Sequence, residues 1–349
     1  MRQENAWIEI HAQNRFFPAV RSLYLLRNHG KVGLKGEQVV VHCGEEEVQR
    51  HPLPQLDQIL VYGNLQLSTP LIRACLDRQV SIAYFSRSGW CQGRVQPIET
   101  GYRHRMRHQQ MLTGVERLSA ASTLIRSKIA NGRVLLLRLT RRQRREDVRP
   151  ALERLAWLMG RVSARGTAER IRGLEGNAAL EYQRALGVLL AENRFTVLGR
   201  HYRPPTSPFD AMSSYGYGVL AHALQTRLEL QGLDPYEGVL HVGSPRHPVL
   251  VSDLIEPLRT LLVDPFNVWL IRTGRQLEGR GFEHRDGGVF LESTARRAWM
   301  EAWSEHMAEE VQLASDRRGP RWEILDDLVR AMMRFVYDPA GGLAVPHRR

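Results

Sequence analysis

Between residues 22 and 95, apolar residues fall in short runs rich in β-branched side chains and separated by turn residues, which predicts strands. The run "LYLLRNHGKVGLKGEQVVVH" is broken at "NHG" and at "KGE", and both breaks predict hairpin turns. Further strands are predicted at "QILVYG", "VSIAYF" and "WCQGRV", the last two joined by a turn at Ser88–Gly89. The stretch "STPLIRACLDR" predicts one short helix, capped by Ser68 or Thr69, with Pro70 suited to its first position.

After "QPIETG" the apolar residues recur every three to four positions, which predicts helices. Turn signals at "GLDPYEG" and "EHRDGG" interrupt this pattern. We therefore expect an α+β multidomain chain, with a small N-terminal β domain followed by a larger, nearly all-helical C-terminal domain. The predicted helical segments are 102–160, 167–192, 206–231, 253–262, 292–313 and 320–336.

These patterns divide the chain into five parts. The expected parts are an extension or linker at 1–21, the N-terminal β domain at 22–97, a linker at 98–104, the C-terminal helical domain at 105–336 and a flexible tail at 337–349.

Positive charge is concentrated in one part of the chain. The formal net charge is +12, and residues 101–172 alone contain 18 Lys and Arg against 5 Asp and Glu. A positive field confined to one segment favours a polyanionic partner, most often nucleic acid, over arginine-rich helices that only keep the protein soluble. The candidates for contacting a nucleic-acid backbone without regard to sequence are Arg103, Arg105, Arg107, Arg138, Arg141, Arg142, Arg144 and Arg145.

The three cysteines lie far apart and form no CxxC pair, so a zinc ribbon and a disulfide framework are both disfavoured. The sequence shows no apolar run of 18 residues and no signal peptide. We expect a cytoplasmic protein with no membrane association.

The stretch "LHVGSPRHPVLVSDLIEPLR" places ionisable side chains beside an apolar run. Asp253 and Glu256, three residues apart, lie on one side of a predicted helix, and a returning loop would bring His241 over that side. Two carboxylates and an imidazole suit Mg²⁺ or Mn²⁺. The alternative is structural: Asp253 caps the helix, Glu256 completes a capping box, and His241 lies in the core.

A third carboxylate would complete such a site, and the candidate is Glu175. It lies in "RIRGLEGNAALEYQRAL" between Gly173 and Gly176, small residues that allow another backbone or a nucleic-acid strand to approach closely. Glu181 and Glu192 are nearby rivals that lack small neighbours. Glu175 could equally be an acidic residue favoured by a helix N-terminus.

Four motifs occur in a consistent order and spacing: "LEGNAALEY", "SPFDAMSSYGYGVL", "GVLHVG" and "PVLVSDLIEPLR…VD". Together with the N-terminal strands, they resemble the CRISPR-associated integrase family, the "Cas one" endonucleases of spacer acquisition, over residues 22–336. Asp210 stands where the family usually has Asn, in a segment that we interpret as helix packing, with Tyr215 and Tyr217 in the core.

The resemblance implies an enzyme of antiviral defence that hydrolyses and transesterifies phosphodiesters to insert new spacers into a CRISPR array. It implies Mg²⁺ or Mn²⁺ bound by Glu175, His241 and Glu256, with Asp253 as a weaker further ligand and Arg259 near the DNA. His241 could instead relay a proton to the leaving oxygen.

The partners implied are double-stranded DNA (the captured segment and the CRISPR repeat), a second copy through the β domain, and a small ferredoxin-like "Cas two" subunit. A further spacer-processing subunit is left open. Two alternative functions remain at this point: a metal-dependent nuclease that cleaves branched DNA in repair, and a non-catalytic DNA-binding scaffold.

Overall fold

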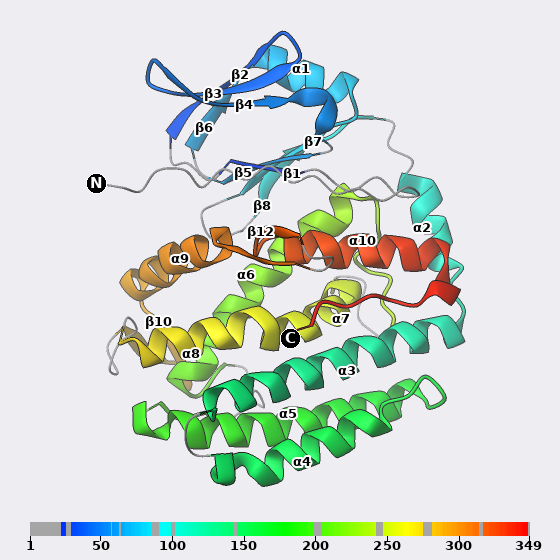
Figure 1. Ribbon diagram of the computed structural model, residues 1–349, viewed down its shortest axis with the longest axis vertical. Coiled ribbons are helices and arrows are strands. Elements are labelled where there is room, and N and C mark those ends of the chain that lie inside the picture. Colours follow the sequence, from blue (N-terminus) through cyan, green and yellow to red (C-terminus); the bar gives the residue numbers. More distant parts are fainter. Residues whose placement is uncertain are drawn as a thin grey trace.

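The computed structural model describes residues 22–25, 29–56, 58–62, 64–85, 91–98, 102–141, 145–193, 195–197, 204–241, 247–274, 281–313 and 317–347. The expected extension at 1–21 lies outside them. Two β-sheets stand at one end of the molecule, and a layered set of helices forms the rest (Figure 1). The fold class expected from the sequence is confirmed.

The outer sheet has the strand order β4-β3-β2-β6, with bounds β2 His29–Lys35, β3 Gln38–Cys43, β4 Glu46–Pro52 and β6 Asn64–Leu67. β2 and β3 are antiparallel and joined at "KGE", where Gly36 has φ +62°, so this predicted hairpin is confirmed. A 3₁₀ turn (Leu53–Gln55) follows β4. α1 (Thr69–Asp77) is capped by Ser68, whose Oγ accepts the backbone N–H of Leu71.

The inner sheet has the order β1-β5-β7-β8, with bounds β1 Ser22–Leu25, β5 Gln58–Tyr62, β7 Ser81–Phe85 and β8 Cys91–Val95. β1, β5 and β7 are parallel, and β8 is antiparallel to β7. The predicted hairpin at "NHG" is wrong, because β1 and β2 belong to different sheets. Leu23 and Leu25 are fully buried, which explains why β1 lies beside β5 rather than beside the more exposed β2. The turn predicted at Ser88–Gly89 lies outside the described residues.

The helical part begins with α2 (Tyr102–Gln110), which starts inside the expected linker, and the periodic segment 102–160 forms three helices. Thr113 begins α3 with a capping box to Glu116. The helices of this part are α2, α3 (Gly114–Leu139), α4 (Arg145–Arg161), α5 (Ala168–Leu190), α6 (Pro208–Leu230), α7 (Val249–Leu258), α8 (Asp264–Arg272), α9 (Ser293–Ala308) and α10 (Glu323–Tyr337), with a 3₁₀ turn at Ala191–Asn193 after α5.

α7 begins at Val249, four residues before the helix start that the sequence predicts at Asp253. Pro257 therefore lies inside the helix, where it removes one backbone hydrogen bond. A π-helical turn (Arg259–Val263) follows directly and connects α7 to α8. Irregular backbone thus follows Glu256 closely.

The C-terminal domain also contains two hairpins, which the expectation of a nearly all-helical domain omitted. β9 (Phe282–Arg285) pairs with β10 (Gly288–Leu291), and β11 (Glu310–Gln312) pairs with β12 (Arg318–Pro320). The "EHRDGG" turn is the β9–β10 connection, with positive φ at Asp286 and Gly287. A DG pair of this kind is a hairpin signal, and the strands beside it are too short to show a clear period.

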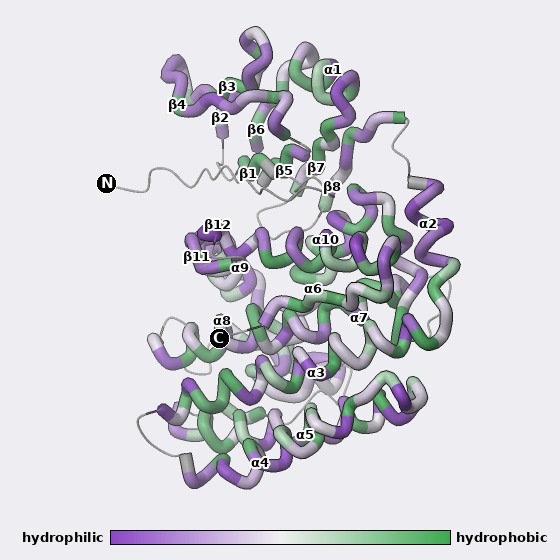
Figure 2. The backbone as a smooth tube through the Cα atoms, turned by 45° about the vertical axis from the view of Figure 1, so that its right-hand side comes forward, coloured by the Kyte–Doolittle hydropathy of each residue, from purple (hydrophilic) through white to green (hydrophobic). Residues whose placement is uncertain are grey.

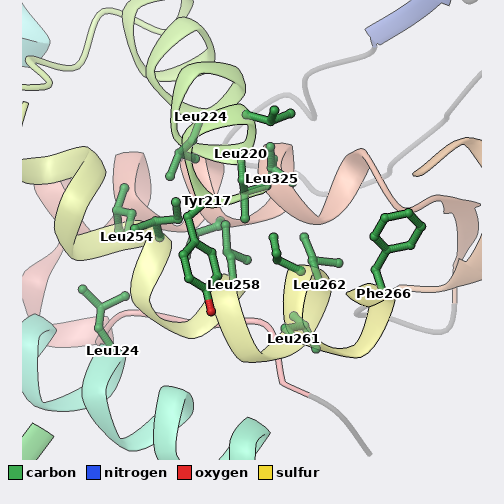
Figure 3. Packing of buried hydrophobic residues seen from close by; sticks show 14 of the residues in the cluster. Leu124, Tyr217, Leu220, Leu224, Leu254, Leu258, Leu261, Leu262, Phe266 and Leu325 are labelled. Carbon is green, nitrogen blue, oxygen red and sulfur yellow. The ribbon is translucent and has the colours of Figure 1, made fainter. Parts of the chain in front are cut away.

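Two apolar clusters share the inner sheet. Ile59, Val61 and Ile82 belong to the cluster under the outer sheet and α1. The alternate residues Leu60 and Ala83 belong to the large cluster of the helical part, because successive side chains of a strand point to opposite faces. In that large cluster, leucines of α3, α6, α7 and the π-helical turn surround Tyr217 (Figure 3).

The last described residues run back across α3 (Figure 1). Leu343 is buried, and the Asn131 side chain contacts the carbonyl of Pro346 at 3.4 Å. The expectation of a loose tail is therefore wrong for residues 338–347, because Leu343 and Val345 pack against the main core. A 3₁₀ turn (Pro339–Gly341) begins this segment. Within the part of the chain that the structure describes, no helix is long and apolar enough to cross a membrane.

Candidate active site

A cavity of about 470 Å³ opens where α3, α5 and α7 meet. Glu175 reaches it from α5, Glu256 from α7, and His241 from the segment before α7. The structure thus brings together the three residues that the sequence singled out, although they are separated by up to 81 positions in the chain. Glu181 and Glu192, the rivals of Glu175, are not among the lining residues, and Glu181 pairs with Arg184.

Lys128 of α3 lies between the two glutamates. Its Nζ donates to Oε2 of Glu256 at 2.5 Å and also to Oε1 of Glu175. The lysine side chain is only 10% exposed, so its ammonium is largely removed from water. Such a group is stable when opposite charges accept its hydrogen bonds, and the two carboxylates meet that requirement.

Glu256 is held from two sides. Arg259, one helical turn later, binds its other oxygen, with 2.7 Å between Nη1 and Oε1. The Glu256 side chain is only 6% exposed, and Lys128 and Arg259 supply the opposite charges that a buried carboxylate needs. The guanidinium of Arg259 also lies over the ring of Tyr217, 5.1 Å from the centroid.

Asp253 supports His241 instead of capping a helix. Its Oδ2 accepts the backbone N–H groups of Val239 and Leu240, and its Oδ1 accepts both the N–H and the ring Nδ1 of His241. The capping-box interpretation of Asp253 and Glu256 is therefore wrong, because both lie inside α7. Asp253 is not among the residues that line the cavity, and its oxygens already accept four hydrogen bonds.

The hydrogen bond that the His241 ring donates to Asp253 raises the pKa of His241 above its ordinary value. Burial opposes this shift, while the negative charges of Asp253, Glu256 and Glu175 add to it. Because Nδ1 is taken, Nε2 is the nitrogen that remains available to a ligand in the cavity. A carboxylate that fixes the ring in this way is the usual support of a metal-binding histidine.

A second group of buried polar residues anchors the cavity floor. Tyr182 and Tyr217 each donate a hydroxyl hydrogen bond to a different oxygen of Asp264. Thr260 in the π-helical turn donates to the carbonyl of Lys128, and Asn131 donates to the carbonyl of Pro257. These contacts tie the irregular backbone after Glu256 to α3. The expectation that Tyr215 and Tyr217 are core residues is confirmed for Tyr217, which is 8% exposed.

The donor set fits a hard divalent cation in its chemistry, since carboxylate oxygens with one imidazole suit Mg²⁺ or Mn²⁺. Among the described residues, however, no three His, Cys, Asp or Glu side chains are close enough to share a metal ion as they stand. Lys128 occupies the space between the two carboxylates. An ion bound there would replace a cation that the structure already places at that position.

The predicted DNA-contacting arginines do not form one patch. α2, which carries Arg103, Arg105 and Arg107, is hydrophilic over most of its length (Figure 2). Arg138 and Arg141 are exposed at the opposite end of α3, a helix of 26 residues. At about 1.5 Å per residue such a helix is ~39 Å long. Arg105 is half-buried and donates to the carbonyl of Gln231.

Arg142 and Arg144 lie outside the described residues, as does the side chain of Arg145, the first residue of α4. Arg259, by contrast, lines the cavity itself.

Sequence reasoning missed Lys128 and Asp264 as parts of the site. The sequence does contain an indication of Lys128. It lies on the same face of α3 as the buried Leu124, Ile125 and Ile129, and a helix face that packs against a core is expected to be apolar. His247 and Ser252, whose side chains contact each other at 2.9 Å, also line the cavity. Nothing in their spacing indicated this.

Comparison with known proteins decides the family. A family model described as "CRISPR associated protein Cas1" matches residues 23–305. The chain belongs to the Cas1 family. The "CRISPR-associated endonuclease Cas1 1" of Moorella thermoacetica is 32% identical over 301 residues, covering 84% of this chain and 88% of that protein. Membership of the Cas1 family therefore indicates a nuclease that acts on DNA, as the sequence resemblance implied.

Solved structures of Cas1 relatives share the fold. The chain described as "Partial Cas6-RT-Cas1--Cas2 complex" has a TM-score of 0.77 at 20% identity, covering 93% of this chain and 98% of that one. A casposase bound to its integration product has a TM-score of 0.68 at 20% identity, with 93% and 97% covered. At this identity the likeness concerns the fold alone.

Proposed function

We propose that this Cas1 family member is a divalent-metal-dependent DNA integrase and endonuclease that inserts spacers into a CRISPR array by transesterification. The observation that supports this most directly is the convergence of Glu175, His241 and Glu256 on one cavity from three separate segments. Relatives named endonucleases and a structural neighbour captured with an integration product agree with this reaction class.

In this proposal Glu175, His241 and Glu256 hold Mg²⁺ or Mn²⁺. When bound, the ion polarises a phosphoryl oxygen and favours the attacking or leaving 3′-oxygen. Asp253 holds the imidazole of His241 in one orientation. Arg259 places a positive charge in the cavity, where a backbone phosphate would enter. No side chain becomes covalently attached to DNA in such a step.

The partners belong to the same proposal. A neighbour solved with Cas2 supports a small Cas2-type subunit. The exposed arginines of α2 and of the C-terminal end of α3 support a DNA backbone as ligand. A homodimer through the N-terminal β domain, and any additional processing subunit, rest on the family resemblance. The scaffold alternative loses its structural basis, because Asp253 and Glu256 are not helix caps.

Strand joining with a labelled protospacer and a repeat-containing plasmid tests the proposal, with and without a Cas2-type subunit and with Mn²⁺, Mg²⁺ or EDTA. Glu175→Ala, His241→Ala and Glu256→Ala should each abolish metal-dependent joining and leave DNA binding intact. Glu181→Ala, on the same helix as Glu175 but outside the cavity, is the matched control. Normal joining by the triple variant would show that the site is wrong, and cleavage of branched DNA without any joining would favour the repair nuclease.

A further inference from the structure

Lys128 has a position that the proposed reaction does not explain. Its ammonium lies between Glu175 and Glu256, with both carboxylates as hydrogen-bond acceptors. The residue as a whole is 9% exposed, so its charge is buried at a place where two acidic side chains from different helices come together. Neither carboxylate could approach the other so closely without a cation between them.

The charges around the cavity show what this cation does. Among the described lining residues, three carboxylates (Glu175, Glu256 and Asp264) accompany two fixed cations, Lys128 and Arg259. Arg259 binds Oε1 of Glu256. Lys128 binds the other oxygen, Oε2, and also binds Glu175, so it links the two carboxylates. Lys128 therefore keeps the carboxylate pair together.

A divalent ion that used the same two carboxylates would need the same space. Metal–oxygen distances of about 2.0–2.2 Å leave no room for an ammonium between the same oxygens, and two cations this close repel each other strongly. The lysine stem is flexible, so the ammonium can turn away without movement of α3. Asn131 binds the carbonyl of Pro257, and Thr260 binds the backbone carbonyl of Lys128, so the contacts between α3 and the backbone that follows Glu256 would stay in place during this exchange.

We propose that Lys128 is an internal counter-cation that assembles the two carboxylates in the metal-free protein and is displaced when a divalent ion binds, so that it weakens metal affinity. The proposal rests on the proposed function only in taking Glu175 and Glu256 as metal ligands. It makes Lys128 a positioning residue that competes with the ion. A lysine that merely braced the site would have the opposite effect, since its loss would let the carboxylates separate and weaken binding.

Calorimetric titration of the full chain with MnCl₂ distinguishes these two roles. Lys128→Met and Lys128→Gln should bind Mn²⁺ at least about tenfold more tightly than the wild type, which corresponds to about 1.4 kcal/mol. Arg126→Met is the matched control, because Arg126 is an exposed cation on the same helix that contacts the carbonyls of Met159 and Val162 outside the cavity. Its affinity should stay within twofold of the wild type.

Thermal unfolding gives an independent readout. The Lys128 variants should unfold at a lower temperature than the wild type without metal, and saturating Mn²⁺ should remove most of this difference. Equal or weaker Mn²⁺ binding by both Lys128 variants, with measurable binding by the wild type, overturns the counter-cation proposal alone. Absence of Mn²⁺ binding in the wild type and in both variants overturns the metal site itself.

The composition of the chain permits a direct view of the displacement. It contains three lysines, Lys31, Lys35 and Lys128, so a sample labelled with ¹³C at lysine Cε gives three assignable signals. Titration with the diamagnetic ion Mg²⁺ should shift the Lys128 signal and leave those of Lys31 and Lys35, both in β2, unchanged. A Lys128 signal that does not move at Mg²⁺ concentrations that saturate the protein contradicts the exchange.

Discussion

Asp253 binds His241 twice through the same oxygen, at 2.6 Å from the ring Nδ1 and at 3.0 Å from the backbone nitrogen. The first contact sets the orientation and charge of the imidazole, and the second fixes the backbone that carries it. Asp253 is therefore the residue through which α7 positions His241 in the cavity.

Asp253→Asn should lower the pKa of His241, because it removes the carboxylate that raises it. It should also lower the free energy of unfolding by about 2–4 kcal/mol, since a buried amide cannot accept all four hydrogen bonds. The stability that comes from the imidazolium is present at pH values below the ordinary pKa of histidine and is lost as the pH rises through the raised pKa of His241. The difference in the free energy of unfolding between wild type and variant should therefore be largest at acidic pH.

An NMR titration of the His241 ring and urea unfolding at several pH values measure both effects. An unchanged ring pKa would contradict the role assigned to Asp253.

Gly238→Ala should disturb the same contact from the loop side. A Cβ at this position would lie 2.8 Å from Oδ2 of Asp253 and 3.0 Å from Val249. We expect a loss of about 1–3 kcal/mol in the free energy of unfolding, because the loop must move away from the carboxylate that binds it. Gly218→Ala is the control. Gly218 is exposed on α6, and a Cβ there would meet no atom within 4 Å, so alanine should be neutral or stabilising. Equal effects of the two substitutions would show that the close approach at Gly238 is unimportant.

Arg227→Met should be strongly destabilising. Arg227 is 1% exposed and donates to Asp326 at 3.1 Å, and Asp326 also accepts from Gln58 of the inner sheet at 3.3 Å. Removing the cation breaks a buried ion pair, which costs about 3–5 kcal/mol. Guanidinium unfolding of Arg227→Met, Asp326→Leu and the double variant measures this. The double variant should be less destabilised than the sum of the two single variants; strict additivity would refute the coupling.

Glu323 predicts a pH dependence of stability. Burial raises its pKa to about 8, and the neighbouring Arg317 opposes this shift. The folded protein then holds a proton on Glu323 that the unfolded chain has lost between pH 4.5 and 8, so stability falls as the pH rises through this window. The slope from this group is at most about 1.4 kcal/mol per pH unit.

Glu323→Gln should flatten that slope, because glutamine does not titrate. Urea unfolding at pH 5.5, 7 and 8.5 compares the two proteins. A wild-type stability that does not fall relative to the variant over this range would mean that Arg317 keeps Glu323 ionised.

The general architecture could be predicted from local patterns, because strand and helix periods are properties of neighbouring residues. Strand partners could not. β1 is followed in sequence by β2 but pairs with β5, and only the burial of Leu23 and Leu25 between two layers explains this. The start of α7 was misplaced for a similar reason. Asp253 has the residue type of a cap, but the amides that it accepts belong to a loop brought there by tertiary folding.

The site was predictable to the extent that its chemistry depends on residue type and family motif. Glu175, His241 and Glu256 could be selected as candidates because carboxylates and an imidazole stand beside small or apolar residues, and all three line the cavity. Lys128 was not, since a single lysine in a long helix is ordinarily a solvent-exposed residue. The role of Lys128 depends on two acidic partners that lie 47 and 128 positions away in the chain.

The inner sheet joins the two parts of the chain, because each of its faces belongs to a different apolar cluster. A truncation that removed residues 22–97 would leave the helical layers with a bare surface where Leu60, Ala83 and Phe85 had been. Neither half is thus a detachable module, and heat should melt the whole chain in one step.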